Sequence, residues 1–165
     1  MKIDTIISQQ HQPKPVILVF GKLCAGKGTY CAPFVHDYGY HHISTSSVVK
    51  QVSGQFTRDK LQDTGSMHQA IAGELIDQMQ QHDKVIVDGI RQPQIVQAVL
   101  DHFGHNNVDM VWLNVPDDVR RERYLPRGDA KDTQSFDDAD AGDQQLGLKD
   151  VERQYRSKMI NVDNY

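Results

Sequence analysis

The sequence lacks long apolar runs, a set of paired cysteines and an excess of basic residues. It has 165 residues, two cysteines, one tryptophan and a net charge of −4. Two cysteines exclude a secreted multi-disulfide framework, and no stretch is apolar enough to span a bilayer. The first fifteen residues also lack the features of a signal peptide. We therefore expect a cytoplasmic protein that binds no membrane, and its charge disfavours duplex nucleic acid as a partner.

The length and composition predict a single globular domain over residues 1–165. Hydrophobic residues make up 38% of the chain and charged residues 24%, which is ordinary for a soluble protein with one core. Residues 1–14 carry no clear pattern, and we expect them to form a short N-terminal arm.

Apolar runs that alternate with amphipathic segments predict the fold class. Helical periodicity extends over Ser66–His82 and Gln92–Gly104, and Asp117 begins a third helix that runs toward Leu125. Strands alternating with helices predict an α/β fold with a five-stranded, mainly parallel sheet and helices on both faces. The predicted strands are Val16–Phe20, His41–Ile43, Lys84–Asp88, Val108–Val115 and Met159–Asn164.

The segment after the first predicted strand has the pattern of a phosphate-binding loop. It reads G-x-x-x-x-G-K from Gly21 to Lys27, and a helical segment follows. In such a loop, backbone N–H groups, a helix N-terminus and the lysine surround an anion. Ligands of parallel sheets bind at the carboxyl ends of the strands, where this loop lies. The residues predicted to hold the nucleotide phosphates are Gly21, Cys24, Ala25, Gly26, Lys27, Gly28 and Thr29.

An acidic segment interrupts the pattern of strands and helices. Residues 129–143 contain six aspartates and little apolar material beyond Phe136. We interpret residues 127–145 as a short, solvated, mobile lid. A calcium-binding loop is excluded because Gly142 comes one residue early and Lys149 stands where a bidentate glutamate is required.

The residues around the loop resemble those of adenylate kinases and related nucleoside monophosphate kinases. The loop ends in Gly26-Lys-Gly-Thr29, and the run up to Tyr38-Gly-Tyr-His-His-Ile-Ser-Thr45 continues the resemblance. Asp88-Gly-Ile-Arg91, followed by Pro93-Gln94, is similar to the family's Asp-Gly-Phe-Pro-Arg and Pro-Gln. The resemblance covers residues 16–127, and residues 57–65 look closest to phage and archaeal (deoxy)nucleoside monophosphate kinase-like proteins.

This resemblance implies a P-loop kinase fold and transfer of the γ-phosphoryl group of ATP to a (deoxy)nucleoside monophosphate. It implies that waters held by Thr29 and Asp88 bind Mg²⁺, and that the acceptor region is 45–82. Such a transfer between anions requires charge neutralisation and exclusion of water. The catalytic residues implied are Lys27, Asp88, Arg123 and Arg127. The acceptor-binding residues implied are Thr45, Lys50, Arg58, Gln62, Arg91 and Gln94.

The sequence departs from the family pattern in two places. Leu23 and Cys24 replace the usual Pro-Gly of the loop, and residues 128–152 contain none of the arginines that usually follow the lid. Two other functions therefore stay open. One is a kinase for another small acceptor, such as dephospho-coenzyme A. The other is a nucleotide-binding switch with slow ATP hydrolysis.

Overall fold

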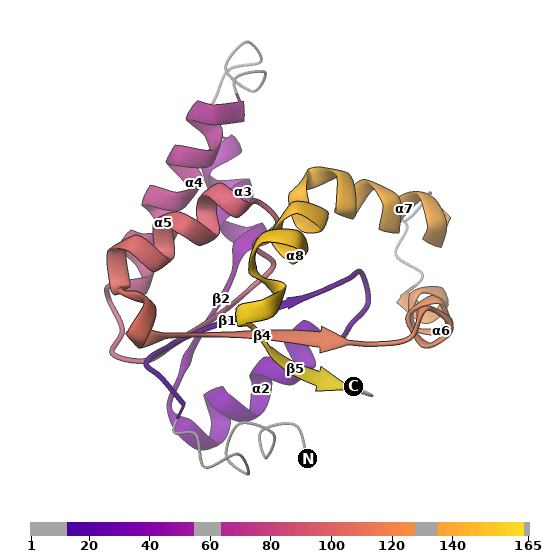
Figure 1. Cartoon of the computed structure of the whole chain (residues 1–165), viewed down its shortest axis with the longest axis horizontal. Helices are drawn as coiled ribbons and strands as arrows, with labels where there is room; N and C mark the ends of the chain where they lie inside the picture. Colours follow the sequence, from indigo (N-terminus) through magenta and orange to yellow (C-terminus); the bar gives the residue numbers. More distant parts are fainter. Residues whose placement is uncertain (1–12, 55–63, 128–134, 164–165) are drawn as a thin grey trace.

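The computed structural model describes residues 13–54, 64–127 and 135–163 and contains one five-stranded sheet (Figure 1). The strand order is β2-β3-β1-β4-β5, and all four pairings are parallel. The predicted α/β class and parallel sheet are therefore confirmed. The strands are β1 (Val16–Gly21), β2 (His41–Ser44), β3 (Val85–Asp88), β4 (Val108–Asn114) and β5 (Ile160–Asp163).

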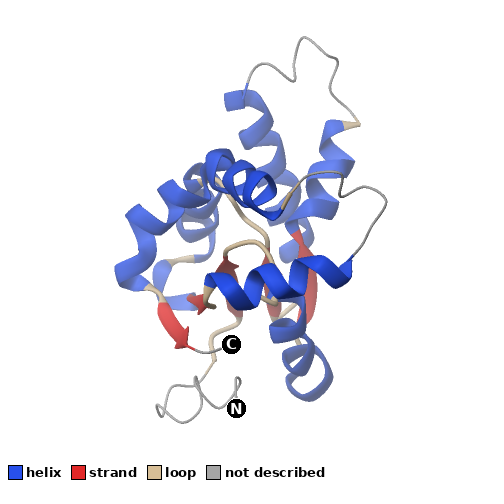
Figure 2. Ribbon diagram, turned by 90° about the vertical axis from the view of Figure 1, so that its right-hand side faces the viewer, coloured by secondary structure: helices blue, strands red, loops and turns tan. Residues whose placement is uncertain are grey.

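Helices cover both faces of the sheet (Figures 1 and 2). On one face lie α3 (Thr45–Ser53), α4 (Thr64–Met79), α5 (Pro93–Phe103) and α8 (Lys149–Tyr155), and on the other lies α2 (Lys27–Tyr38). At the carboxyl edge of the sheet are α6 (Asp117–Arg127) and α7 (Phe136–Asp143). Short turns η2 (His105–Asn107), η3 (Gln144–Leu148) and η4 (Arg156–Lys158) join these elements.

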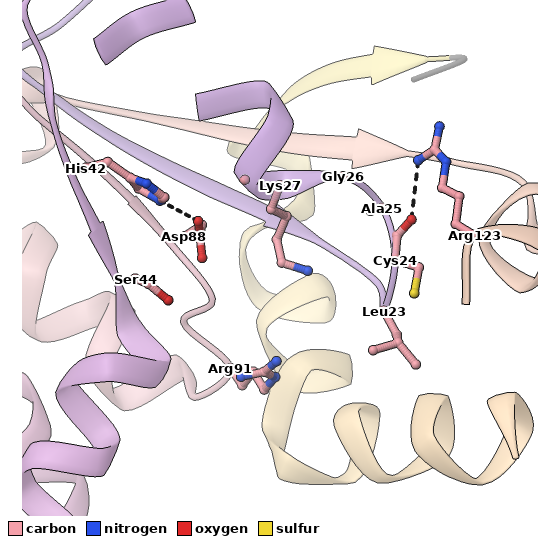
Figure 3. Close-up of a pocket in the computed structure, with 11 residues that line it drawn as sticks. Leu23, Cys24, Ala25, Gly26, Lys27, His42, Ser44, Asp88, Arg91 and Arg123 are labelled. Carbon is pink, nitrogen blue, oxygen red and sulfur yellow. Dashed lines mark hydrogen bonds and ion pairs between the residues drawn. The ribbon is translucent and has the colours of Figure 1, made fainter. Parts of the chain in front are cut away.

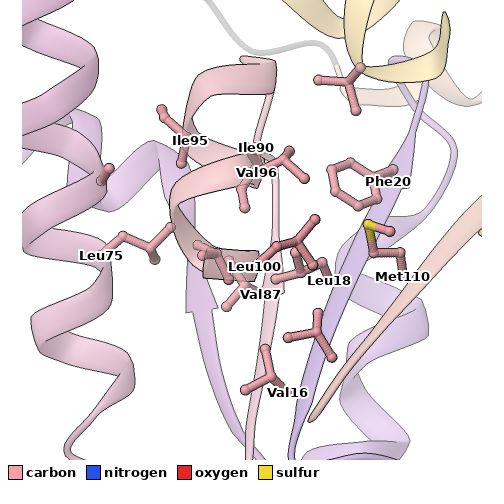
Figure 4. Close-up of a cluster of buried hydrophobic side chains, with 14 of the residues drawn as sticks. Val16, Leu18, Phe20, Leu75, Val87, Ile90, Ile95, Val96, Leu100 and Met110 are labelled. Atoms are coloured by element: carbon pink, nitrogen blue, oxygen red, sulfur yellow. The ribbon is translucent and has the colours of Figure 1, made fainter. Parts of the chain in front are cut away.

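The central strand β1 is buried on both faces, which explains its uninterrupted apolar sequence. Its alternate residues enter two separate cores. Leu18 and Phe20 pack with α5 and α4 (Figure 4), whereas Ile17 and Val19 pack with Phe34 of α2. Burial of this strand on both sides fixes the position of the loop that begins at its carboxyl end.

The boundaries of the predicted elements agree with the structure within about three residues, and three helices were not predicted. The predicted end of α5 is confirmed, since the N–H of Gly104 donates to the Leu100 carbonyl oxygen at 2.9 Å. Sequence periodicity did not reveal α3, α7 or α8, which have only nine, eight and seven residues. No helix in the described ranges is long and apolar enough to cross a membrane.

Residues 127–145, which we interpret as a solvated, mobile segment or lid, are helical in most of their described C-terminal part. Residues 136–143 form α7, whose N-cap Ser135 accepts a hydrogen bond from the backbone N–H of Asp138 at 3.2 Å. Phe136 is buried and packs edge-on against Tyr124. Asp137 and Asp138 lie in the first turn of α7, where they stabilise the helix N-terminus, and Asp140 and Asp143 form ion pairs with Arg120 and Arg91. Residues 128–134 lie outside the described ranges.

The predicted N-terminal arm, 1–14, falls mostly outside the described residues. Its last residue, Lys14, is fixed to the sheet and to β2. The backbone N–H of Lys14 donates to Asp109 at 3.1 Å, and its carbonyl accepts from the Tyr40 hydroxyl at 2.7 Å. Burial raises the pKa of Tyr40 to about 12, and Asp109 adds to this shift.

Candidate active site

The loop between β1 and α2 forms a tight turn that only certain residues allow. Gly26 has a φ of 86°, and Cys24 has a φ of 63°, which is rare for a residue with a side chain. A Cβ atom at Gly21 would lie 2.8 Å from the Cβ of Ala25, so the loop closes tightly on its own start. The departure from the family pattern at Cys24 therefore leaves the loop intact, with Cys24 in the left-handed conformation that suits glycine.

Lys27 is held back against the loop by two backbone carbonyls. Its Nζ donates to the Gly21 oxygen at 3.1 Å and to the Lys22 oxygen at 3.4 Å. Burial lowers the pKa of Lys27, and Arg91 adds to this effect, whereas Asp143 and Asp88 oppose it. Both cationic and anionic side chains therefore act on this ammonium, and Figure 3 shows two of them, Asp88 and Arg91, lining the same cavity as Lys27.

These side chains line one cavity of about 570 Å³ at the carboxyl edge of the sheet (Figure 3). Its volume is in the range of sites for small organic ligands. The loop forms one wall, and β2, β3 and α6 contribute the others. The lining residues are Leu23, Cys24, Ala25, Gly26, Lys27, Gly28, His42, Ser44, Asp88, Arg91 and Arg123.

Asp88 ends β3 beside the loop, as the sequence predicted, but it has a partner that the sequence did not reveal. His42 Nε2 lies 2.6 Å from Asp88 Oδ2, and the Cys31 thiol lies 3.9 Å from the same oxygen. In the parallel pairing of β2 with β3, Ser44 lies opposite Asp88. His42 is two residues earlier on β2, so its side chain lies on the same face of the sheet as that of Ser44. The polar His42 in a predicted strand was the available signal. Burial raises the pKa of the Cys31 thiol, and the negative charge of Asp88 adds to this shift.

The oxygen atoms near the loop fit a hard divalent cation. Thr29 lies exposed in the first turn of α2, and the Asp88 carboxylate lines the cavity. Hydroxyl and carboxylate oxygens are the donors that suit Mg²⁺ and its waters. The residues present are therefore chemically suited to the ion that the resemblance implies.

Two of the predicted arginines line the cavity, and each has a partner in the structure. Arg91 Nε lies 2.7 Å from Asp143 Oδ1, and Arg123 Nη1 donates to the Cys24 carbonyl at 3.3 Å. Arg127 is the last residue of α6, but its side chain is outside the described set. The structure thus brings Arg91 and Arg123 to the loop from two different elements.

The predicted acceptor residues other than Arg91 are placed less uniformly. Thr45 is buried, and its hydroxyl donates to the Asp88 carbonyl at 2.7 Å, while Ser44 lines the cavity. Lys50 and Gln94 are exposed on α3 and at the start of α5. Arg58 and Gln62 lie outside the described residues.

The sequence did not identify Arg120 as a residue of this region, although it is 1% exposed. Its Nη1 donates to the Leu23 carbonyl at 3.0 Å and to Asp140 Oδ1 at 2.8 Å, and its Nη2 donates to Asp117 Oδ1 at 2.7 Å. Burial opposes its charge, but the hydrogen bonds to Asp140 and Asp117 prevail and raise the pKa of Arg120. This guanidinium therefore joins the loop to α6 and α7.

A glycine fixes the segment after α7 against the cavity. Gly147 in η3 has a φ of 126°, and a Cβ atom there would lie 2.4 Å from the Arg91 carbonyl oxygen. Only a residue without a side chain allows this approach. Gly147 and the Arg91–Asp143 pair together hold the segment from α7 to η3 against Arg91.

Comparison with known proteins gives relatives that include several bacterial adenylate kinases. The chain is 30% identical over 135 residues to an adenylate kinase of Porphyromonas gingivalis, which covers 68% of this chain and 65% of that protein. It is 30% identical over 137 residues to an adenylate kinase of Bacteroides thetaiotaomicron, which covers 74% and 71% of the two chains. The chain therefore spans about two thirds of the length of these relatives.

The parallel sheet, with a glycine-rich loop between its central strand and a helix, defines a P-loop α/β protein. A family model described as an AAA domain matches residues 17–144, which include the loop, β3 and α6. With the relatives above, this match shows that the chain belongs to the adenylate kinase-like nucleoside monophosphate kinase family.

A solved structure supports the fold independently. The crystal structure of a gluconokinase from Sinorhizobium meliloti 1021 superposes with a TM-score of 0.57 and covers 93% of this chain and 84% of that one. The two sequences are 17% identical, so this likeness concerns the fold alone.

Proposed function

We propose that this protein is a nucleoside monophosphate kinase that transfers the γ-phosphoryl group of ATP to a (deoxy)nucleoside monophosphate. The observation that supports it most is the cavity lined by Lys27, Arg91 and Arg123 together with Asp88. Phosphoryl transfer between two anions depends mainly on positioning and charge neutralisation, which three cations around one cavity supply. The relatives named as adenylate kinases support the same class of reaction.

Each residue has a defined task in this proposal. Lys27 and the loop N–H groups bind the β- and γ-phosphates, and Arg91 binds the acceptor phosphate. An acceptor phosphate oxygen bonds to the γ-phosphorus while the bond to the ADP oxygen breaks. Arg123 and Arg127 then neutralise charge on the group in transit. Since Arg123 already donates to Cys24, its guanidinium is held at the loop before the substrate binds.

The Mg²⁺ ion that accompanies ATP supplies charge neutralisation at the phosphate oxygens when it is bound. Thr29 and Asp88 are the residues that would hold its waters. His42 Nε2 lies at hydrogen-bond distance, 2.6 Å, from Asp88 Oδ2 and thereby fixes the carboxylate that performs this task.

We propose that the acceptor nucleoside binds along α3 and the segment that follows it. Ser44 and Thr45 lie at the N-terminus of α3, next to the cavity, and Lys50 lies on the same helix. A helix N-terminus favours an anionic group. The proposed acceptor-binding set also includes Arg58, Gln62 and Gln94. Assays with a panel of nucleoside monophosphates identify the base that this set selects.

One observation favours a second function, a nucleotide-binding switch with slow ATP hydrolysis. Arg91, the proposed ligand of the acceptor phosphate, is paired with Asp143, and residues 128–152 contain no arginine to replace it. A site whose acceptor cation is already neutralised transfers slowly to an acceptor, whereas water still reaches bound ATP.

A coupled assay of ADP release with a panel of ribo- and deoxyribonucleoside monophosphates separates these functions. The kinase requires an acceptor for ADP release, whereas the switch releases ADP at the same slow rate without one. Dephospho-coenzyme A belongs in the panel to test another acceptor class. Lys27→Ala is expected to abolish transfer, while Lys158→Ala, which changes an exposed lysine on η4, retains it. Acceptor-independent turnover at equal rates would refute the kinase.

A further inference from the structure

Beside the phosphate loop, three side chains with different metal-binding atoms lie together. Cys31, His42 and Asp88 each offer one ligand atom, and these atoms all lie within 4.8 Å of one another. They come from α2, β2 and β3, so three separate elements bring them together. Among the described residues, these are the histidine, cysteine and carboxylate side chains that lie close enough together for three of them to bind one ion.

The distances are near those of a tetrahedral metal site. His42 Nε2 lies 2.6 Å from Asp88 Oδ2, and Cys31 Sγ lies 3.9 Å from the same oxygen. Around zinc, with bonds of ~2.0–2.3 Å, neighbouring ligand atoms of a tetrahedron lie ~3.3–3.7 Å apart. The His42–Asp88 separation must open and the thiol must approach, each by about an ångström or less. Rotation of the His42 side chain, which is 33% exposed, supplies the opening without moving the sheet.

The ligand atoms select one class of metal. A thiolate, an imidazole and a carboxylate suit zinc and similar first-row ions, whereas Mg²⁺ prefers oxygen ligands alone. Cys31 is fully buried, so its sulfur has no access to water, while His42 and Asp88 line the cavity. A metal bound here therefore has three protein ligands and a fourth position that faces the cavity. The hydroxyl of Thr45 holds the Asp88 backbone at 2.7 Å, which fixes the central ligand.

We propose that Cys31, His42 and Asp88 form a binding site for Zn²⁺ or a similar first-row divalent ion, distinct from the site of the nucleotide's Mg²⁺. When the metal–sulfur bond forms, the thiol of Cys31 gives its proton by way of the neighbouring Asp88 carboxylate to the solvent of the cavity, and a water or phosphate oxygen takes the fourth position. Asp88 belongs to both sites, so the two ions exclude each other.

Cobalt titration of the full chain, without nucleotide or Mg²⁺, tests this site directly. Co²⁺ is expected to bind with 1:1 stoichiometry and give thiolate-to-cobalt charge-transfer absorption with the intense visible bands of four-coordinate cobalt. Stoichiometric Zn²⁺ removes this spectrum. Excess Mg²⁺ without nucleotide leaves it, because the thiolate and imidazole hold the first-row ion much more tightly than Asp88 holds Mg²⁺. A wild-type protein that shows no thiolate band overturns the proposal.

Variants identify the ligands. Cys31→Ser loses the thiolate band, whereas the control Cys24→Ser, which changes the loop cysteine, keeps it. His42→Gln retains the band but binds Co²⁺ at least ~10-fold more weakly. If Cys31→Ser does not fold, the His42→Gln result decides alone. A band that survives Cys31→Ser, that disappears in Cys24→Ser, or that keeps its full affinity in His42→Gln contradicts the site.

One consequence rests on the proposed function. Zn²⁺ bound to Asp88 prevents this carboxylate from holding the waters of Mg²⁺, so micromolar Zn²⁺ is expected to inhibit phosphoryl transfer. The His42→Gln variant binds Zn²⁺ more weakly, so its transfer activity should be less sensitive to Zn²⁺. Binding is measured without substrate, so it stands or falls separately from the kinase activity. Cobalt binding without transfer would refute the kinase alone, and transfer without cobalt binding would refute the metal site alone.

Discussion

Arg91 and Asp143 form an ion pair at the edge of the candidate active site, with Nε 2.7 Å from Oδ1. Arg91 comes from the loop after β3 and Asp143 from the end of α7, fifty-two residues later in the chain. In the proposed reaction Arg91 holds the acceptor phosphate. The Asp143 carboxylate thus lies where an anionic substrate has to bind, and it competes with that substrate for the same guanidinium.

Asp143→Asn is expected to strengthen acceptor binding. Both partners are largely but not fully buried, and a pair of this kind contributes ~0.5–1 kcal/mol, which corresponds to a roughly two- to fivefold lower KM for the acceptor. The KM for ATP should change little. Steady-state kinetics with the best acceptor of the panel measures both constants.

The matched control for this prediction is Asp137→Asn, which removes a charge from the same helix. Asp137 pairs with Arg121, and both side chains are exposed. This variant should leave the acceptor KM unchanged. If Asp143→Asn raises the acceptor KM instead, Asp143 orients Arg91 for substrate and does not compete with it.

Arg120→Ala is expected to destabilise the protein by ~3 kcal/mol, because it leaves Asp140 and the Leu23 carbonyl without their buried partner. Arg121→Ala is the control, since Arg121 and its partner Asp137 are both exposed and solvent weakens such a pair, so a much smaller loss is expected. Urea denaturation followed by circular dichroism measures both. Equal losses in the two variants would show that Arg120 does not join the loop to α7.

Gly147→Ala should destabilise the protein by ~2 kcal/mol or more and weaken catalysis. The new Cβ atom would lie 2.4 Å from the Arg91 carbonyl, at a φ of 126° that alanine rarely adopts. Gly142→Ala on α7 is the control, because nothing lies within 4 Å of its Cβ position. This control should be neutral or stabilise by up to ~1 kcal/mol. Thermal melts of both variants check the prediction, and a Gly147→Ala melt that matches wild type would contradict it.

The stability of the protein is expected to fall as the pH decreases below about 6.5. Burial lowers the pKa of His41, and His82, whose ring stacks on it at 3.7 Å, adds to this shift. The folded state therefore resists protonation of His41, while the unfolded state accepts the proton near the ordinary pKa of 6.5. The contribution of His41 to the free energy of unfolding is therefore fully present above pH 6.5 and is lost as the pH falls below that value.

Replacement of the stacked partner tests this pH dependence. In His82→Gln the fall in Tm between pH 7.5 and pH 5 should be smaller than in wild type, whereas the control His105→Gln on η2 should show the wild-type fall. Melting curves over this pH range measure the difference. Identical pH profiles for wild type and His82→Gln would exclude the stacked pair as a source.

Local sequence patterns predicted the elements that build the loop, because strand and loop residues are adjacent in the chain. The apolar run before Gly21, the glycine spacing and Asp88 at a strand end each follow from local chemistry. The pairs of Arg91 with Asp143 and Arg120 with Asp140 join residues far apart in sequence, so no local pattern reveals them. For the same reason the acidic composition of this region did not reveal that Asp137, Asp140 and Asp143 pair with arginines on other elements.

The most direct test of the phosphate-loop assignment is a crystal structure with a nonhydrolysable ATP analogue and Mg²⁺. The account predicts that the β- and γ-phosphates lie within hydrogen-bond distance of the backbone N–H groups between Cys24 and Thr29. Lys27 Nζ should leave the Gly21 and Lys22 carbonyls for a phosphate oxygen. A triphosphate bound elsewhere, or a Lys27 that keeps both carbonyl hydrogen bonds beside bound nucleotide, would contradict it.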